Sequence, residues 1–290
     1  MPKIFTVAGG DMRFSSLAAQ LADEFTVYAA GFDPGIIKSH RVTLINDITK
    51  DLPEADCLVL PLPVSNDGSS LNTPLYEGTI PLELLLKAVK KNGTVFGGKI
   101  SEDIRSIFEA AGFKVFDYLE REEMAVLNAL ATAEGALQIA LEKQPCTISG
   151  QNILILGMGR IAKSLIRILS GFGCSVTIAA RKYSDLAWAE VYGCKELHIS
   201  ELLYSDALSK SDIIFNTVPS MILNKALLKK CNVSCLMIDL ASKPGGIDIN
   251  AAEGLGLRAV RALSLPGKTA PVSSGRIIGN TIKNILNETE

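Results

Sequence analysis

Short apolar runs alternate with stretches of helical periodicity through the first half of the chain. The apolar runs predict strands at residues 4–8, 25–29, 57–60, 94–96 and 114–117. The stretches between them, with apolar residues at helical spacing, predict helices at residues 14–21, 81–89 and 102–110. This alternation is typical of a parallel sheet covered by helices on both faces.

The second half repeats the alternation after the longest helical pattern, residues 121–142. Strands are predicted at residues 152–156, 175–180, 213–216, 235–240 and 259–261. The sequence therefore predicts an α/β protein of two doubly wound parallel-sheet domains with a cleft between them. Residues 1–120 would form a flavodoxin-like substrate-side domain, and residues 121–290 the linking helix plus a Rossmann dinucleotide-binding domain. We expect the helix at residues 276–290 to pack back on the first domain.

One glycine-rich turn carries a dinucleotide fingerprint. Gly157, Gly159 and Ala162 fill the special positions of G-x-G-x-x-G/A between a strand and a helix. The first allows a tight turn, the second lets the backbone approach a pyrophosphate, and the third packs the helix on the strand. The alternative is a turn that only joins two elements. The expected cofactor contacts follow successive strands, at Gly157, Met158, Gly159, Arg160, Ile161, Ala180, Arg181, Lys182, Thr217, Val218, Pro219 and Ala241.

The end of the second strand of this unit bears on the choice of cofactor. NAD sites usually place a carboxylate there, to accept hydrogen bonds from the ribose 2′-hydroxyl. Here the strand ends at Ala180 and continues into Arg181 and Lys182. Because an arginine can bind a 2′-phosphate through paired hydrogen bonds, these residues favour NADP over NAD. The alternative interpretation is a solvated basic turn.

Composition narrows the class of protein without identifying it. The chain has 290 residues, nearly half of them apolar, and a net charge of −2. Scattered basic residues argue against a nucleic-acid or membrane-surface protein, and no metal site is expected because the six cysteines lack zinc-site spacing. No apolar run approaches the roughly 20 residues of a membrane span, and the N-terminus lacks a signal-peptide layout. We therefore expect a cytoplasmic protein.

Candidate chemistry has to come from residues other than histidine. A 2-hydroxyacid dehydrogenase of the usual kind needs a late catalytic histidine, whereas the only two here are His40, in a polar loop, and His198, interpreted as structural. Lys243 and Lys268 are expected in glycine- and proline-rich loops after strands, where a cation can bind a substrate carboxylate or assist proton transfer. Ordinary solvated lysines are the alternative for both.

The other candidates lie in loops that follow strands and on the linking helix. Asn128 and Thr132 are one turn apart on that helix, where a ligand or a helix-to-loop hydrogen bond would satisfy them. The candidate catalytic residues are Lys243, Lys268 and Asn128. The candidate substrate-binding residues are Arg13, Ser65, Thr132, Glu134 and Ser242.

Several segments together resemble the family of dipicolinate synthase A subunits from endospore-forming bacteria. They are VAGGDMR at residues 7–13, REEMAVLNA at 121–129, TAEGA at 132–136, LGMGR at 156–160, NTVPS at 216–220, DLASKPGG at 239–246 and LPGKTAP at 265–271. The match runs nearly end to end. Ala8 is a small departure, where a bulkier apolar residue is expected.

The resemblance implies a function and a partner. Members of the family act with a flavoprotein-like B subunit to form dipicolinate from dihydrodipicolinate during sporulation. NADP would accept the hydride, and a dicarboxylate would fit a cleft lined by Arg13, Lys243 and Lys268. Two alternatives stay open. One is an NADP-dependent dehydrogenase of another small acid, similar to shikimate dehydrogenase; the other is a nucleotide-binding scaffold protein.

Overall fold

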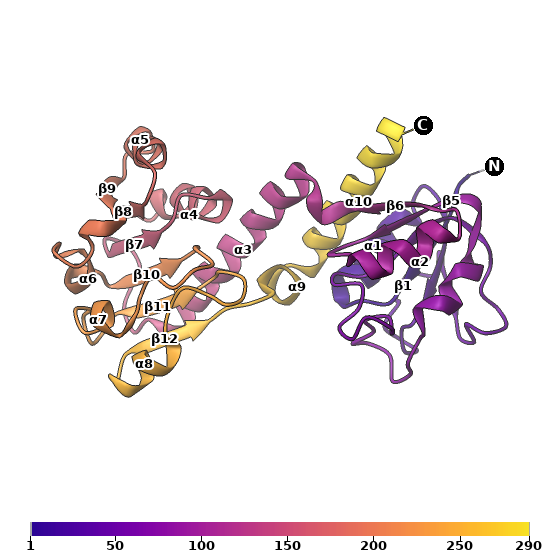
Figure 1. The fold of residues 1–290 in the computed structure, drawn as a ribbon, viewed down its shortest axis with the longest axis horizontal. Coiled ribbons are helices and arrows are strands. Elements are labelled where there is room, and N and C mark those ends of the chain that lie inside the picture. The colour runs from indigo at the N-terminus through magenta and orange to yellow at the C-terminus, as the bar shows by residue number, and fades with distance from the viewer. Residues whose placement is uncertain (1, 290) are drawn as a thin grey trace. The chain divides into compact units, whose positions relative to one another are not determined.

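The computed structural model describes residues 2–289, which divide into two compact units (Figure 1). Unit 1 comprises Met1–Asn128 and Ala270–Glu290, and unit 2 comprises Ala129–Thr269. The division therefore falls inside the long helix rather than at residue 120, where the sequence pattern placed it. The last segment of the chain belongs to unit 1.

Unit 1 is built on a six-stranded parallel sheet. Its strands are β1 (Ile4–Ala8), β2 (Thr26–Ala30), β3 (Val42–Ile45), β4 (Ala55–Val59), β5 (Val89–Gly97) and β6 (Lys114–Asp117). Their order is β3-β2-β1-β4-β5-β6, the Rossmann order, so the flavodoxin-like order expected from the sequence is wrong. The difference is the edge strand β3. The apolar pattern does not reveal it because four residues with an exposed Thr43 lie in a polar stretch.

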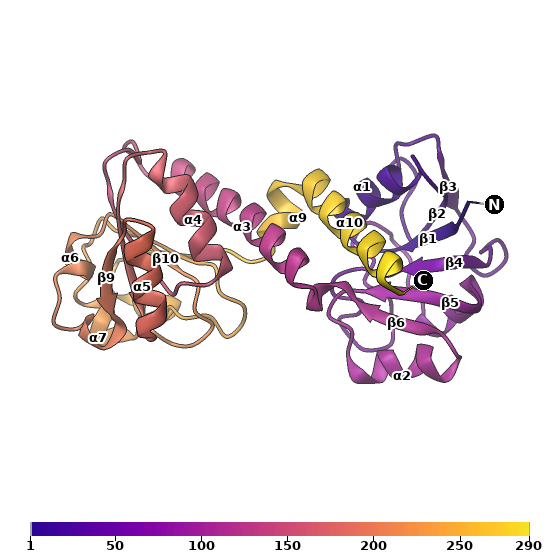
Figure 2. The ribbon, with the colours of Figure 1, turned by 90° about the horizontal axis from the view of Figure 1, so that it is seen from above.

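Helices cover both faces of this sheet. They are α1 (Met12–Leu21), α2 (Glu102–Ala110) and α10 (Pro271–Thr289), with the short 3-10 helices η1 (Leu82–Ala88) and η2 (Tyr118–Glu120). Because side chains alternate along a strand, Val59 packs with α1 and α10 on one face while Leu58 packs with η1 and α2 on the other. α10 lies beside α1 in both ribbon views (Figure 2). Its buried residues Ile278 and Ile282 thus complete the core of unit 1.

Unit 2 repeats the same architecture. Its strands are β7 (Asn152–Leu156), β8 (Ser175–Ala180), β9 (Lys195–His198), β10 (Ile213–Asn216), β11 (Leu236–Asp239) and β12 (Arg258–Arg261). All pair in parallel, in the order β12-β11-β10-β7-β8-β9. Read from its first strand, this is again the Rossmann order, and its switch point lies between β7 and β10. Two doubly wound parallel-sheet domains, the second of Rossmann type, are therefore confirmed.

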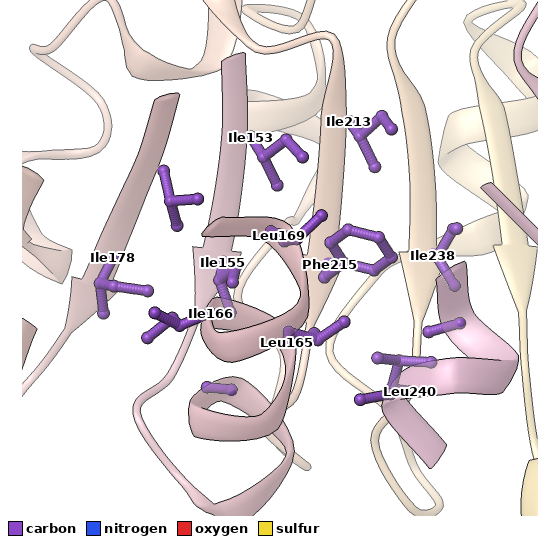
Figure 3. Close-up of a cluster of buried hydrophobic side chains, with 14 of the residues drawn as sticks. Ile153, Ile155, Leu165, Ile166, Leu169, Ile178, Ile213, Phe215, Ile238 and Leu240 are labelled. Carbon is purple, nitrogen blue, oxygen red and sulfur yellow. The ribbon is translucent and has the colours of Figure 1, made fainter. Parts of the chain in front are cut away.

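The helices of unit 2 also divide between two faces. They are the second part of α3 (Glu122–Lys143), α4 (Arg160–Ser170), α5 (Tyr183–Val191), α6 (Ala207–Lys210), α7 (Lys225–Leu228), α8 (Ile249–Gly254) and α9 (Leu265–Thr269), with the 3-10 helix η3 (Ile199–Glu201). Figure 3 shows Ile155 and Phe215 packed against Leu165 of α4. Leu154 and Ile214 face the opposite way, toward Leu208 and Leu228 in the helices of the other face.

The helix α3 is the one described helix that is long and apolar enough to cross a membrane. Some of its apolar residues belong to the two cores, whereas Val126, Leu127 and Leu141 are exposed. Met124 packs in unit 1, whereas Ala133, Ala136 and Ala140 are fully buried in unit 2. The second part of α3 is therefore a core helix of unit 2.

Candidate nucleotide site of unit 2

A pocket of about 310 Å³ lies at the carboxyl ends of β7, β8 and β10. This is the switch-point edge of the sheet, where doubly wound folds bind their ligands. Nine of the expected cofactor residues line it, namely Gly157, Met158, Gly159, Ala180, Arg181, Lys182, Thr217, Val218 and Pro219. Three others do not: Arg160 and Ile161 begin α4, and Ala241 is buried beyond β11.

The two glycines of the fingerprint have different local roles. Gly157 has a φ of +95°, and a Cβ there would lie 2.6 Å from Oγ1 of Thr217, so a larger side chain would be strained and would clash. Gly159 is the N-cap of α4, provides no side-chain cap, and has no atom within 4 Å of the position its Cβ would take. The backbone at the start of α4 is therefore open to an anionic group.

Arg181 and Lys182 form the basic end of the pocket. Both are exposed, and within residues 2–289 the Arg181 guanidinium has no ion-pair partner. The Arg181 carbonyl lies 3.0 Å from Nε2 of His198, and because a carbonyl only accepts, the imidazole donates this bond. The His198 ring also stacks on Tyr183, with centroids 5.4 Å apart. Through these two contacts, His198 supports the backbone of the basic turn at Arg181, which is a structural role.

Sequence reasoning missed four residues of the pocket: Ala179, Asp185, Ile199 and Ile222. Asp185 is half-buried in the first turn of α5 and brings a carboxylate to the basic end. Its position depends on how α5 begins after Lys182, and no glycine signal marks that start. Ser220 continues the segment after β10 that was already expected to contribute.

In unit 1, the candidate Arg13 is buried and ion-paired. Its Nε lies 2.9 Å from Oδ1 of Asp11, and its Nη2 donates to the Leu62 carbonyl at 3.3 Å. Nearby, burial raises the pKa of Tyr118 well above its ordinary value, so the phenol stays protonated and donates to the Leu60 carbonyl. Any carboxylate bound by Arg13 would compete with Asp11.

Ser65 lies in a turn at the same edge of unit 1. Its hydroxyl donates to Asp67 at 3.0 Å and accepts from the Gly68 amide at 2.9 Å. Asp67 also accepts backbone N–H bonds from Ser70 and Ser69, which hold the pKa of this carboxyl well below its usual range. The local bonds of Ser65 thus define a turn, and its substrate role stays a prediction.

The glycine turn after β1 is covered by the chain itself. Gly9 and Gly10 follow β1, as in a nucleotide-binding turn, but a Cβ on Gly9 would lie 2.9 Å from Leu71 and 3.0 Å from the Asn72 carbonyl. The Gly10 amide donates to that same carbonyl at 2.9 Å. The segment around Leu71–Thr73 therefore covers the turn that would otherwise face a pyrophosphate.

The unit 2 candidates for substrate binding lie on three elements. Ser242 and Lys243 are exposed in the loop after β11, and Lys268 is exposed on α9, a short helix rather than the expected loop. Leu265 and Pro266 are the buried residues of this helix. α9 packs on α3 at Gly135, where a Cβ would lie 2.9 Å from Oγ1 of Thr269.

The remaining candidates lie on α3. Thr132 is buried, Glu134 is exposed, and Asn128 is half-buried at the end of the first segment of unit 1. Within residues 2–289, neither Lys243 nor Lys268 takes part in an ion pair. Over the same residues no three metal-ligating side chains of His, Cys, Asp or Glu gather at one point.

The sheet order, the glycine turn and the pocket define a Rossmann-fold oxidoreductase dependent on a nicotinamide dinucleotide. Residues 127–254 accordingly match the family described as D-isomer specific 2-hydroxyacid dehydrogenase, NAD binding domain. Residues 4–119 match the N-terminal domain family of the dipicolinate synthase A subunit. The A subunit of dipicolinate synthase from Bacillus subtilis (strain 168) is 30% identical over 292 residues, covering 98% of this chain and 96% of that protein. The chain belongs to the family of dipicolinate synthase A subunits.

Solved structures support the same assignment. The dipicolinate synthase A subunit from Bacillus halodurans has a TM-score of 0.87 at 27% identity, covering 98% of this chain and 97% of the other. Its Bacillus subtilis counterpart has a TM-score of 0.86 at 28% identity, covering 99% and 97%. A transhydrogenase from Sinorhizobium meliloti shares the fold, with a TM-score of 0.70 at 15% identity. The resemblance read from the sequence motifs is thus confirmed.

Proposed function

We propose that this chain catalyses the NADP-linked oxidation of dihydrodipicolinate to dipicolinate in the cytoplasm of a sporulating cell, acting with a B subunit. The reaction removes two hydrogens: a hydride goes to the cofactor and a proton to a base, which leaves an aromatic pyridine ring. The observation that carries the proposal is the pocket at the end of β7, in a chain of this family, with Arg181 and Lys182 at one end.

The pocket fits a dinucleotide on its own geometry. The open position of Gly159 leaves room for a pyrophosphate beside the first amides of α4, and the positive end of that helix favours negative charge. Arg181 and Lys182 would hold the 2′-phosphate, while Thr217, Val218 and Pro219 would line the other half. When bound, the nicotinamide supplies the hydride acceptor.

The chain's cations are the proposed partners of the substrate carboxylates. Lys243 and Lys268 are exposed and make no ion pair within the described residues, so no internal carboxylate competes for them. Ser242 and Thr132 add hydroxyl groups that would donate to a carboxylate. Arg13 and Ser65 are the candidates proposed in unit 1. Asn128 and Glu134 on α3 complete the proposed set.

NAD is the alternative cofactor, and one observation favours it. Asp185 brings a carboxylate to the same end of the pocket as Arg181, where it would accept a bond from a free ribose 2′-hydroxyl. Binding of NADP⁺ and NAD⁺ to the purified chain, compared by calorimetry, decides between them. We expect tighter binding of NADP⁺.

The proposed reaction is tested with freshly generated dihydrodipicolinate and NADP⁺, with and without the B subunit. Formation of dipicolinate together with reduced nicotinamide is the expected result. Turnover by the chain alone would exclude the scaffold alternative. Absence of product with both subunits present, while another small acid is oxidised, would overturn the proposed substrate.

A further inference from the structure

Two polar side chains are completely buried beside the nucleotide pocket. Asn216 ends β10 and Asp239 ends β11, and the two residues are direct partners in the parallel pairing of these strands. Nδ2 of Asn216 donates to Oδ1 of Asp239 at 2.7 Å. Burying a carboxylate away from water costs free energy unless hydrogen-bond donors surround its oxygens. The donors that surround Asp239 therefore show which segments this side chain holds together.

Each oxygen of Asp239 receives donors from the loop that follows β11. Oδ1 also accepts from the amide of Ala241 at 3.2 Å, and Oδ2 accepts from those of Gly246 at 3.0 Å and Ile247 at 3.3 Å. Nη2 of Arg261 lies 4.0 Å from Oδ2. The carboxylate therefore folds residues 241–247, the loop that carries Lys243, back onto the end of its own strand.

Asn216 connects this carboxylate to the wall of the pocket. Its Nδ2 donates to the Val218 carbonyl at 3.0 Å, and its Oδ1 accepts from the Val218 amide at 3.2 Å. Val218 lines the pocket between Thr217 and Pro219. A Cβ on Gly246 would lie 2.6 Å from the Val218 carbonyl, so the two loops are also in direct contact.

We propose that Asp239 is a positioning residue that, through Asn216, holds the pocket wall at Val218 and the Lys243 loop as one rigid piece. The inference rests on the proposed function and deepens it. The segment after β10 lies across the switch point from Arg181, and so faces the nicotinamide half of a dinucleotide. The pair thus sets the distance between the hydride acceptor and the loop proposed to bind substrate, without touching either ligand.

Asp239→Asn tests the proposal, because it keeps the shape of the side chain but replaces one acceptor oxygen by a donor. In either amide orientation that donor faces backbone or side-chain donors. We expect the Kd of NADP⁺ to rise about tenfold or more. Adenosine 2′,5′-bisphosphate, which lacks the nicotinamide half, should bind within about twofold of wild type. Hydrogen exchange at the amides of Gly246 and Ile247 should accelerate.

A second variant covers the case in which Asp239→Asn does not fold. Asn216→Ala removes the bonds of Asn216 to Asp239 and to Val218, but leaves the bonds of Asp239 to the amides of Ala241, Gly246 and Ile247 in place. It should weaken the binding of NADP⁺ but not that of adenosine 2′,5′-bisphosphate. Hydrogen exchange should accelerate at the amide of Val218 alone.

Asp212→Asn is the matched control, because Asp212 accepts the Asn152 amide at 2.8 Å at the opposite end of the same sheet. The proposal would be overturned if folded variants at Asp239 and Asn216 bound NADP⁺ like wild type. It would also be overturned if these variants lost affinity equally for NADP⁺ and for the bisphosphate. If wild type bound no dinucleotide, the proposed function would fail, and the exchange rates alone would still test the coupling of the loops.

Discussion

Arg181 is the residue on which the choice between NADP and NAD depends. It follows directly after β8, is exposed, and has no internal ion pair among the residues described. A guanidinium in this state is available for a phosphate, whereas one already held by a carboxylate is not. The nearby Asp185 acts in the opposite direction, since it would repel the same phosphate.

Arg181→Ala should weaken the binding of NADP⁺ far more than the binding of NAD⁺. Loss of charge-assisted hydrogen bonds of about 1.5–3 kcal/mol would raise the Kd of NADP⁺ by tenfold or more and leave that of NAD⁺ nearly unchanged. Calorimetric titration measures both constants. Arg167→Ala, an exposed arginine near the end of α4, is the control. Equal losses for both cofactors would show that Arg181 does not read the 2′-phosphate.

Gly159→Val should abolish dinucleotide binding without unfolding the chain. The position of its Cβ is empty, so the valine clashes with the incoming pyrophosphate and not with the protein. Gly254→Val in α8 is matched, because its Cβ position is also empty and lies away from the pocket. Thermal unfolding and cofactor titration of both variants give the result. Wild-type affinity in Gly159→Val would contradict the assignment of the fingerprint.

Lys268→Ala should lower kcat for the proposed oxidation while the Kd of NADP⁺ stays within about twofold, because α9 does not line the pocket. Lys225→Ala on α7 controls for removal of an exposed lysine. Steady-state rates with both subunits present are the measurement. A normal rate would remove Lys268 from the catalytic set.

The cofactor residues could be predicted from the sequence because their pattern is local. Gly157, Gly159 and Arg181 occupy fixed offsets from strands whose apolar runs are plain. The position of Asp185 at the pocket was not predicted, because it depends on where α5 begins. The role of Asp239 was not predicted either, because a sequence motif does not show that a side chain is buried or which groups it bonds. The proposed substrate residues come from distant parts of the chain, so no local spacing relates them.

At the scale of elements, the apolar runs predict five of the six strands of unit 2, all except β9, and β7 and β8 begin and end where expected. Accuracy fell where an element is short or half-exposed. β3 was missed, and with it the Rossmann order of the first sheet. Lys268 was placed in a loop because Pro266 and Gly267 read as turn residues, although a proline is well tolerated in the first turn of a helix such as α9.

α10 should contribute strongly to the stability of unit 1. Its Ile282 is fully buried against the residues of α1, so Ile282→Ala should cost about 2–5 kcal/mol. Val272→Ala, at an exposed position of the same helix, should change stability by less than about 0.5 kcal/mol. The only tryptophan, Trp188, lies in unit 2, so its fluorescence follows that unit separately.

In urea, Ile282→Ala should shift the transition seen by circular dichroism and leave the Trp188 transition in place. An unshifted circular dichroism transition would mean that α10 adds little to unit 1. A shift in both signals would mean that the two units unfold together.

At the scale of the whole molecule, the chain contains two sheets of the same order, and one of them has a free nucleotide pocket. The turn at Gly9 and Gly10 is covered by the segment around Leu71–Thr73, whereas the turn at Gly157 opens into the pocket. The two turns therefore differ in what covers them rather than in the sheet that supports them.

We expect a stoichiometry of one dinucleotide per chain. The covered turn in unit 1 leaves no space for a pyrophosphate, so Gly159→Val should remove binding altogether instead of halving it. Titration calorimetry of wild type and variant measures both numbers. Two sites per chain, or a residual site in the variant, would show that the segment over Gly9 moves aside.

The division of unit 1 between the two ends of the chain has a consequence for synthesis on the ribosome. Domains generally fold in the order in which they emerge. Here the first sheet is translated early but lacks Ile278 and Ile282 until the last residues are made, whereas unit 2 is continuous and complete before them. We therefore expect unit 2 to fold before unit 1 is complete. Until α10 is synthesised, the first sheet exposes the apolar face that α10 covers, and a chaperone could bind there.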